Sequence, residues 1–317
     1  MAVGRGRRPG EWEAGGAAFA GAAILALALA TWAAVGAFGA RQGRAAAGAE
    51  LQRARARGYV VVAVPLWAPP FGAPSRDGGW AGLDVALARG IAGGALGNPE
   101  RVHLLPVTPG QRIWAARSGA ADAVAAAYAA PGRTPPPLPP GIDAVGPYHT
   151  EPVALLVRRG RPVASWRQLD GTVVGLLPGA AGGERLRALA AAGPGAAARP
   201  VVEESLNAGQ AAADLATGRL RAVLGGLSEC GALAVHDPEL RVQAAAGLGE
   251  QSYWVLVPAG DSGMRAAVRR AIDGLPRGPA LRGALRLWAA AAAPPPLPAP
   301  EPAPGPAPLL TAPSAAA

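Results

Sequence analysis

Residues 58–95 decide the fold, and they read GYVVVAVPLWAPPFGAPSRDGGWAGLDVALARGIAGGA. The apolar run from Tyr59 to Val64 is dominated by valine and predicts a strand that is buried in a sheet. From Leu83 to Ala95 the apolar residues recur at the spacing of a helix. A buried strand followed by a helix is the building unit of a parallel sheet that helices cover.

The same alternation continues toward the carboxyl end of the chain. Further strands are expected at 102–107, 121–127, 152–157, 172–177, 220–224 and 252–257. Helices are expected at 111–118, 184–192, 208–217, 264–273 and 280–291. Strands separated by helical patterns imply parallel sheets with helices on both faces. A chain of 317 residues has room for two such sheets, so we expect an α/β protein with two lobes.

The amino-terminal segment is strongly apolar. No charged residue occurs from Ala14 to Ala40, which exceeds the roughly 20 residues that a membrane-spanning helix needs. Three arginines precede this run within the first eight residues, as in a secretory signal. We expect residues 1–40 to be a signal anchor or a signal peptide. The length of the run favours an anchor, whereas small residues at 35–39 keep cleavage open.

Two further segments flank the folded body. Residues 41–57 are rich in alanine and arginine and predict a stalk with helical propensity. Residues 294–317 alternate proline with alanine and other small residues, a composition that favours extended polyproline II and builds no core. We expect this carboxyl-terminal segment to be a disordered tail.

The composition excludes several classes of protein. The 30 basic residues are all arginines, a uniform bias that is typical of GC-rich coding. Cys230 is the single cysteine, which rules out an intramolecular disulfide framework and a cysteine-based zinc site. The three histidines lie in separate segments, so we expect no metal and no cofactor. More than half of the net charge of +9 lies within residues 1–57, so nucleic-acid binding by the body is not expected.

Several motifs occur in a set order along the body. They are GLDVALARGIA at 82–92, RIWAARSGAAD at 112–122, GPY at 146–148, SWRQLDGTVVG at 165–175 and LRLW at 285–288. In this order they resemble the extracellular solute-binding proteins of family 3. That family has the type II periplasmic-binding-protein fold and supplies polar amino acids to ABC transporters.

The resemblance implies a fold, a location and a set of partners. It implies two α/β lobes joined by two crossing strands, with residues 58–149 and 253–291 in the first lobe and 150–252 in the second. It also implies a monomer that is no enzyme and that captures an amino acid or small carboxylate in the cleft between its lobes. An ABC permease in the membrane would receive that solute. Because such domains act outside the cytoplasmic membrane, we expect the body there, although the arginines after the apolar run argue weakly for the cytoplasm.

The resemblance also assigns ligand-binding positions. Arg133 lies where the family has the arginine that pairs with the α-carboxylate of the ligand, and a guanidinium can give such an anion two parallel hydrogen bonds. The remaining expected ligand-binding positions are Trp67, Phe71, Ala126, Tyr128 and Ala181. Ala126 and Tyr128 replace the usual glycine and threonine, and Ala181 lies in a glycine-rich loop whose N–H groups can meet an anion.

One departure from the family bears on the solute. Gly226 lies where the family has the aspartate that pairs with the ammonium group of the ligand. Three alternatives follow. The cleft binds another small anion or an apolar-bodied acid through Arg133, Trp67 and Tyr128, or it binds an amino acid through a different acid, or it is degenerate. The candidate acids are Glu203, Glu204 and Glu229.

We therefore expect the extracytoplasmic solute-binding component of an ABC importer for a small polar or anionic solute that resembles an amino acid. The alternative is a membrane-tethered sensor or scaffold domain with a degenerate binding cleft.

Overall fold

The computed structural model describes residues 50–191, 199–205, 207–245 and 247–292. The expected signal segment at 1–40 and the expected tail at 294–317 lie outside these ranges. No helix in the part that is described is both long and apolar enough to cross a membrane.

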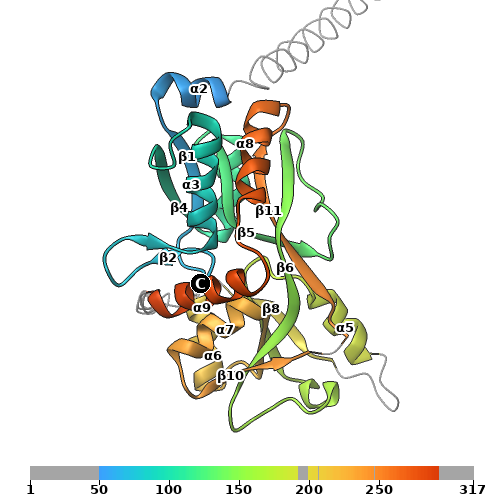
Figure 1. Cartoon of the computed structure of the whole chain (residues 1–317). Helices are drawn as coiled ribbons and strands as arrows, with labels where there is room; N and C mark the ends of the chain where they lie inside the picture. Colours follow the sequence, from blue (N-terminus) through green and yellow to red (C-terminus); the bar gives the residue numbers. More distant parts are fainter. Residues whose placement is uncertain (1–49, 192–198, 206, 246, 293–317) are drawn as a thin grey trace, which may run out of the picture.

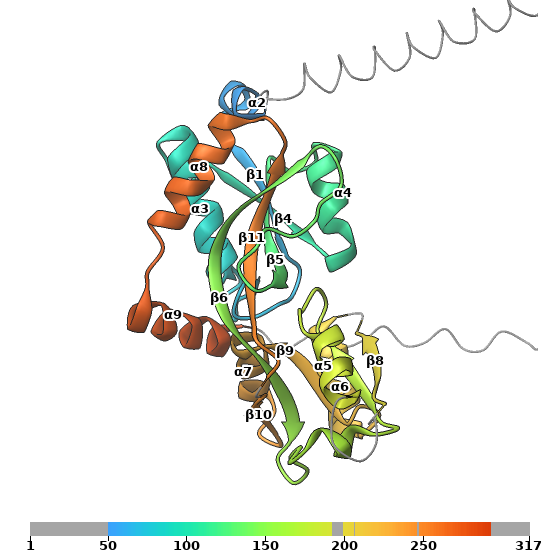
Figure 2. The same ribbon diagram turned by 90° about the vertical axis from the view of Figure 1, so that its right-hand side faces the viewer.

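The chain forms an α/β fold with two lobes (Figures 1 and 2). In the first lobe β1 (Val60–Pro65) pairs in parallel with β4 (Val102–Val107) on one side and with β5 (Ala123–Pro131) on the other. In the second lobe β7 (Val173–Leu176) pairs in parallel with β8 (Val201–Glu204) and β9 (Ala222–Gly226). Each lobe therefore has the parallel sheet that the alternating pattern predicts.

Two long strands run between the lobes. They are β6 (Ile142–Arg158) and β11 (Glu250–Pro258), which pair with each other in antiparallel fashion. On the first-lobe side β11 also pairs with β5, whereas the second half of β6 pairs with β9 and with β10 (Leu240–Ala244). These two strands are neighbours in one continuous sheet.

Helices cover both faces of the first-lobe sheet. One face packs against α3 (Leu83–Leu96) and α8 (Ser262–Asp273), and the other against α4 (Arg112–Arg117), which follows a short 3-10 turn at Pro109–Gln111. The two helices α3 and α8 approach closely at Gly94. A β-carbon there would lie 3.1 Å from the carbonyl oxygen of Ala267, so the glycine allows this packing.

The second lobe is covered in the same way. Its helices are α5 (Gly183–Ala191), α6 (Ala208–Thr217) and α7 (Leu227–His236), with a 3-10 turn at Trp166–Leu169. The last helix, α9 (Gly278–Ala291), leaves the first lobe and packs along α7 (Figure 2). Directly after it, Ala292 bridges to Ser75 between the short strands β2 (Ala73–Pro74) and β3 (Trp80–Ala81) of the first lobe.

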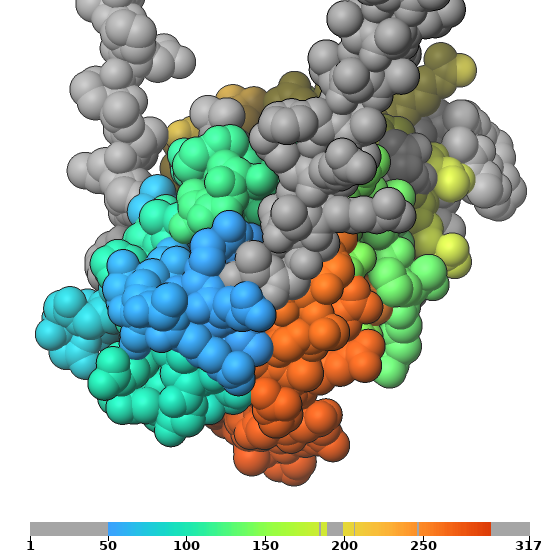
Figure 3. Space-filling view, turned by 90° about the horizontal axis from the view of Figure 1, so that it is seen from above, coloured from blue at the N-terminus to red at the C-terminus, as the bar shows by residue number. Residues whose placement is uncertain are grey.

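The end of the expected stalk is a helix that packs on the first lobe. This helix, α2 (Glu50–Arg57), lies beside α8 at the end of the molecule that is remote from the second lobe (Figures 1 and 3). The buried carboxylate of Asp261 accepts the N–H of Leu51 at 3.0 Å and, as the N-cap of α8, the N–H of Met264 at 2.8 Å. Arg57 forms an ion pair with Asp122.

Candidate functional site

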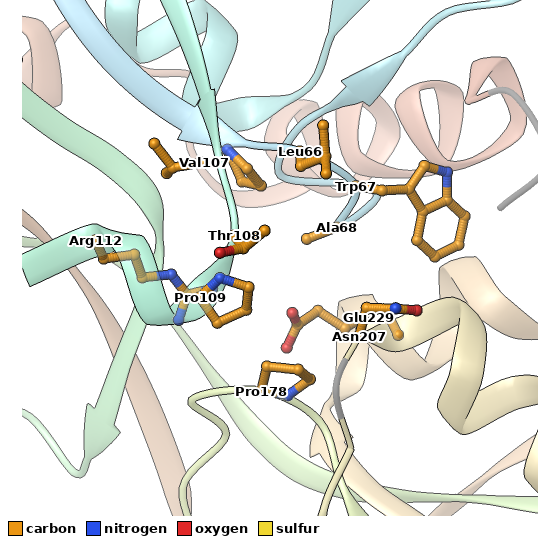
Figure 4. A pocket seen from close by; sticks show the side chains of 12 residues that line it. Leu66, Trp67, Ala68, Val107, Thr108, Pro109, Arg112, Pro178, Asn207 and Glu229 are labelled. Carbon is orange, nitrogen blue, oxygen red and sulfur yellow. The ribbon is translucent and has the colours of Figure 1, made fainter. Parts of the chain in front are cut away.

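A cavity of about 110 Å³ lies between the two lobes. Its walls come from the segments that follow β1 and β4 in the first lobe and β7, β8 and β9 in the second. The carboxyl ends of parallel strands are where open α/β sheets usually bind ligands. The lining residues are Pro65, Leu66, Trp67, Ala68, Val107, Thr108, Pro109, Arg112, Pro178, Asn207, Ala208 and Glu229. Figure 4 shows Arg112 on the first-lobe side of this space and Glu229 on the second-lobe side.

Arg112 is the buried cation of the cavity wall. It begins α4 on the same helix face as the buried residues Ala115 and Ala116, and it is 5% exposed. Among the residues that the structure describes, its guanidinium forms no hydrogen bond and no ion pair. Burial lowers the pKa of Arg112, and the nearby Glu229 acts in the opposite direction. Because a guanidinium stays charged in proteins, this side chain presents an unsatisfied positive charge to the cavity.

Glu229 contributes the carboxyl group that lines the same space. It lies in the first turn of α7, directly after β9, and is buried. Burial and the neighbouring Glu151 raise the pKa of Glu229 to about 8, although Tyr253 and Arg112 act against this shift. The two ionisable groups of the cavity therefore come from opposite lobes.

A cluster of buried polar side chains lies behind Glu229, where the two long strands meet the second lobe. The hydroxyl of Tyr253 lies 2.6 Å from Oε1 of Glu151 and 3.1 Å from Oε2 of Glu229. Nε2 of Gln251 lies 2.5 Å from the same hydroxyl. Oε2 of Glu151 accepts the N–H of Ser228 at 2.7 Å. This cluster connects the crossing strands β6 and β11 to the first turn of α7.

The cluster explains the glycine at position 226. A β-carbon on Gly226 would collide with Glu151 and Tyr253 and would lie 2.7 Å from Nε2 of Gln251. The space that a side chain at 226 would need is therefore filled by side chains from β6 and β11. The nearest carboxyl group that β9 and α7 supply to the cavity is three residues further along, at Glu229.

The structure places Arg133 outside the cavity lining. Its side chain is 71% exposed, and its Nε lies 3.8 Å from Oε2 of Glu250, which is also exposed. Tyr128 is half-buried and lines a wider opening beside the cavity, together with Arg112 and Glu204. These two expected ligand residues are thus not brought together with Glu229.

The other expected positions differ in what they contact. Trp67 is one of the residues that line the cavity. Phe71 is fully buried in the first-lobe core, with its ring centroid 4.2 Å from that of Tyr253. Ala126 is a buried residue of β5, within the first-lobe sheet. The N–H of Ala181 donates to Oε1 of Gln251 at 2.9 Å and so belongs to the polar cluster.

Glu229 is the candidate acid that reaches the cavity. Glu203 is exposed and pairs with Arg219 at 3.1 Å. Glu204 is exposed at the wider opening, where it accepts the N–H of Gly179 at 3.1 Å. Within the described ranges, no group of three or more His, Cys, Asp or Glu side chains is placed to bind a metal ion.

Comparison with curated proteins finds partial relatives. The putative amino-acid ABC transporter-binding protein YhdW of Escherichia coli strain K12 is 33% identical over 79 residues, which cover 25% of this chain and 23% of YhdW. The glutamate/glutamine/aspartate/asparagine-binding protein BztA of Rhodobacter capsulatus is 27% identical over 130 residues, which cover 41% of this chain and 38% of BztA. The chain thus matches less than half the length of either relative.

Solved structures share the fold. The L-cysteine receptor of Neisseria gonorrhoeae superposes with a TM-score of 0.59 at 20% identity, covering 75% of this chain and 91% of that one. The amino acid ABC transporter substrate-binding protein AbpA of Streptococcus pneumoniae, bound to L-arginine, gives a TM-score of 0.60 at 20% identity, covering 75% and 95%. Residues 60–289 also match the family model of the bacterial extracellular solute-binding proteins, family 3. The chain belongs to the bacterial extracellular solute-binding proteins of family 3.

Proposed function

We propose that this chain is the extracytoplasmic solute-binding component of an ABC importer and that it captures a small carboxylate-bearing solute between its lobes. The observation that carries the proposal is Arg112, a buried arginine that faces the interlobe cavity without a partner among the described residues. A planar carboxylate would supply the two acceptors that a guanidinium fork needs.

Similarity to proteins of known ligand supports an amino-acid-like solute. YhdW is named as an amino-acid ABC transporter-binding protein, and AbpA was solved with L-arginine. An ancestral arginine-binding protein with 24% identity and a TM-score of 0.56 was solved with glutamine. The cavity volume of about 110 Å³ is below the roughly 300–1,000 Å³ of pockets for drug-sized ligands, which favours a small solute.

Capture would couple solute binding to the closure of the lobes. We take the lobes as residues 58–149 with 253–291 and residues 150–252, moving about the β6 and β11 strands. Arg112 approaches the second lobe at Gly179, so a solute held by the arginine is enclosed by that loop. Closure of this kind links binding to a change of outer shape, which a permease can recognise. An apolar segment at residues 1–40 would tether the monomer to the membrane.

The test is a thermal-shift screen of the folded body against the common amino acids and a set of small carboxylates. Binding to the native state raises Tm by mass action, so a true solute is expected to stabilise the protein in proportion to its concentration. Arg112→Gln is the control, and it is expected to remove the response. If no compound stabilised the correctly folded wild type, solute capture would be contradicted and the sensor or scaffold role would be favoured.

A further inference from the structure

Glu229 is the carboxyl group that the second lobe contributes to the cavity wall. We propose that Glu229 acts here as a neutral carboxylic acid, held so by Glu151 and Tyr253, and that the site therefore selects small carboxylates without an ammonium group over amino acids. This inference rests on the proposed function, because it concerns the same cavity.

The hydrogen bonds of Gln251 fix the orientation of its side-chain amide. Its Oε1 accepts the backbone N–H of Ala181 at 2.9 Å, so its NH2 group must point the other way. That nitrogen lies 2.5 Å from the hydroxyl oxygen of Tyr253. Gln251 therefore donates to Tyr253, and one acceptor site of the hydroxyl oxygen is occupied.

Tyr253 has a single hydroxyl hydrogen, which it can donate to one carboxyl group. The nearer carboxyl oxygen is Oε1 of Glu151, at 2.6 Å, and the hydrogen goes there. Oε2 of Glu151 accepts the N–H of Ser228 at 2.7 Å and lies 3.3 Å from Nε2 of His149. Both oxygens of Glu151 thus accept hydrogen bonds, one from Tyr253 and one from Ser228, and such bonds favour the charged form of a carboxyl group. Glu151 is therefore the ionised member of the pair.

The contact between the Tyr253 hydroxyl and Glu229 also needs a hydrogen. Two oxygens at 3.1 Å need a hydrogen between them to attract each other. Tyr253 has given its own hydrogen to Glu151, so the hydrogen in this contact comes from Glu229. The hydroxyl oxygen of Tyr253 accepts it with its remaining lone pair.

The electrostatic surroundings of Glu229 agree with this assignment. Burial and the charge of Glu151 raise the pKa of Glu229 to about 8, with the contact to Tyr253 and the charge of Arg112 acting in the opposite direction. Burial also raises the pKa values of Tyr253, Tyr148 and Cys230, so these groups add no charge. The titratable and charged groups around Glu229 are Tyr148, His149 and Glu151 on β6, Tyr253 on β11, Arg112 on α4 and Cys230 on α7.

A neutral Glu229 leaves the cavity wall with the positive charge of Arg112. One carboxylate on the solute neutralises that charge. An ammonium group would face an uncharged acid, or it would require Glu229 to ionise beside Glu151. The second case places two negative charges in one buried cluster, which is unfavourable. An α-hydroxy acid avoids both costs, because its uncharged hydroxyl can form a hydrogen bond with the neutral carboxyl group of Glu229.

The binding test compares amino acids with their α-hydroxy analogues by isothermal titration calorimetry at about pH 7. The probes are L-alanine with L-lactate, and L-leucine with its α-hydroxy acid. The hydroxy acid is expected to bind at least about tenfold more tightly than its amino acid. Glu229→Gln has the shape of the neutral acid and is expected to keep this affinity within about threefold. The same is expected of the control Glu203→Gln, which changes an exposed acid that pairs with Arg219 and lies outside the cavity lining. Tighter binding of the amino acid, lost at least about tenfold in Glu229→Gln, would overturn the inference.

A second measurement needs no solute. Carbon-13 labelling of the glutamate side chains allows Glu229 to be titrated by NMR, with Glu229→Gln identifying its signal. Glu229 is expected to be protonated at neutral pH, and Glu151→Gln is expected to move its midpoint downward, which a merely structural role would not do. An ionised Glu229 at neutral pH would overturn the inference. If Glu229 were neutral but no probe bound, the proposed function and the solute class would fail together, and the neutral acid would stand.

Discussion

The guanidinium of Arg112 in the first lobe lies against Gly179 of the second, with Nη1 2.6 Å from the point where a β-carbon on that glycine would sit. Gly179 also has a positive φ of 78°, which favours glycine. The loop that carries it therefore closes over the arginine because it has no side chain there.

Substitution of this glycine tests the closed arrangement. Gly179→Ala is expected to displace Arg112 and to weaken solute binding at least about tenfold, as measured by calorimetry. Gly171→Ala is the matched control, since Gly171 also has a positive φ, 63°, but a β-carbon there meets nothing within 4 Å. Both variants carry a similar backbone strain of about 1–2 kcal/mol, so equal losses of affinity in the two would contradict the role of Gly179.

The glycine at 226 gives a prediction about stability. Gly226→Ala is expected to lower the free energy of unfolding by at least about 2 kcal/mol, because its β-carbon would collide with the Glu151 and Tyr253 side chains. Gly231→Ala in α7 is the control, because a β-carbon there meets nothing within 4 Å. That variant is expected to gain up to about 1 kcal/mol from helix propensity. Urea denaturation measures the free energy of unfolding of both variants. An unchanged value in Gly226→Ala would show that the side chains of the cluster rearrange to make room for the β-carbon.

The raised pKa of Glu229 leads us to expect that the stability of the folded protein depends on pH. The folded protein holds a proton on Glu229 up to about pH 8, whereas the unfolded chain releases it near the ordinary pKa of 4.5. The contribution of Glu229 to stability is therefore fully present below the ordinary value and is lost as the pH rises through about 8. Asp84, whose pKa burial raises to about 7, adds a slope of the same sign.

The variant Glu229→Gln isolates the first of these two contributions. Its free energy of unfolding, relative to wild type, is expected to rise by on the order of a few kcal/mol between about pH 5 and about pH 9. Urea denaturation at several pH values measures this difference. A difference that did not change with pH would show that Glu229 titrates normally in the folded protein.

We expect Asp261 to hold α2, the helix before the first strand, against the first lobe. Asp261→Ala is expected to cost about 1–2 kcal/mol as a lost N-cap of α8 and to release α2 from the first lobe. Faster amide hydrogen exchange over Glu50–Arg57 measures that release. Asp261→Asn is the control, because its amide oxygen can still cap α8. Unchanged exchange in Asp261→Ala would mean that other contacts, such as Arg57 with Asp122, hold the helix.

Much of the fold is predictable from local patterns. The strand expected at 59–64 is β1 at Val60–Pro65, and the helix expected at 83–95 is α3 at Leu83–Leu96, because both signals are runs or periods within one segment. The helix α7 was not expected, because it begins directly after β9 with no loop between them. The strand β8 was missed because its residues are mostly exposed and it ends in two acids.

The site was less predictable, because its geometry depends on contacts between distant segments. Arg133 follows the end of β5 and is exposed outside the cavity lining, whereas the cavity is lined by Arg112, to which the sequence analysis assigns no role. A signal for Arg112 was present, since Ala115 and Ala116 lie three and four residues later on the same helix face, as in a buried stripe. The choice of Glu229 over two other acids depends on how β6 and β11 fill the space beneath Gly226, which no local pattern contains.

The most direct test of the account compares two arginines by calorimetry with the tightest-binding solute of the thermal-shift screen. Arg112→Gln is expected to weaken binding at least about a hundredfold, because it removes the buried cation that meets the carboxylate. Arg133→Gln, which changes an exposed arginine outside the cavity lining, is expected to alter affinity by less than about threefold. The reverse order, with binding lost in Arg133→Gln and retained in Arg112→Gln, would contradict the assignment of this cavity as the solute site.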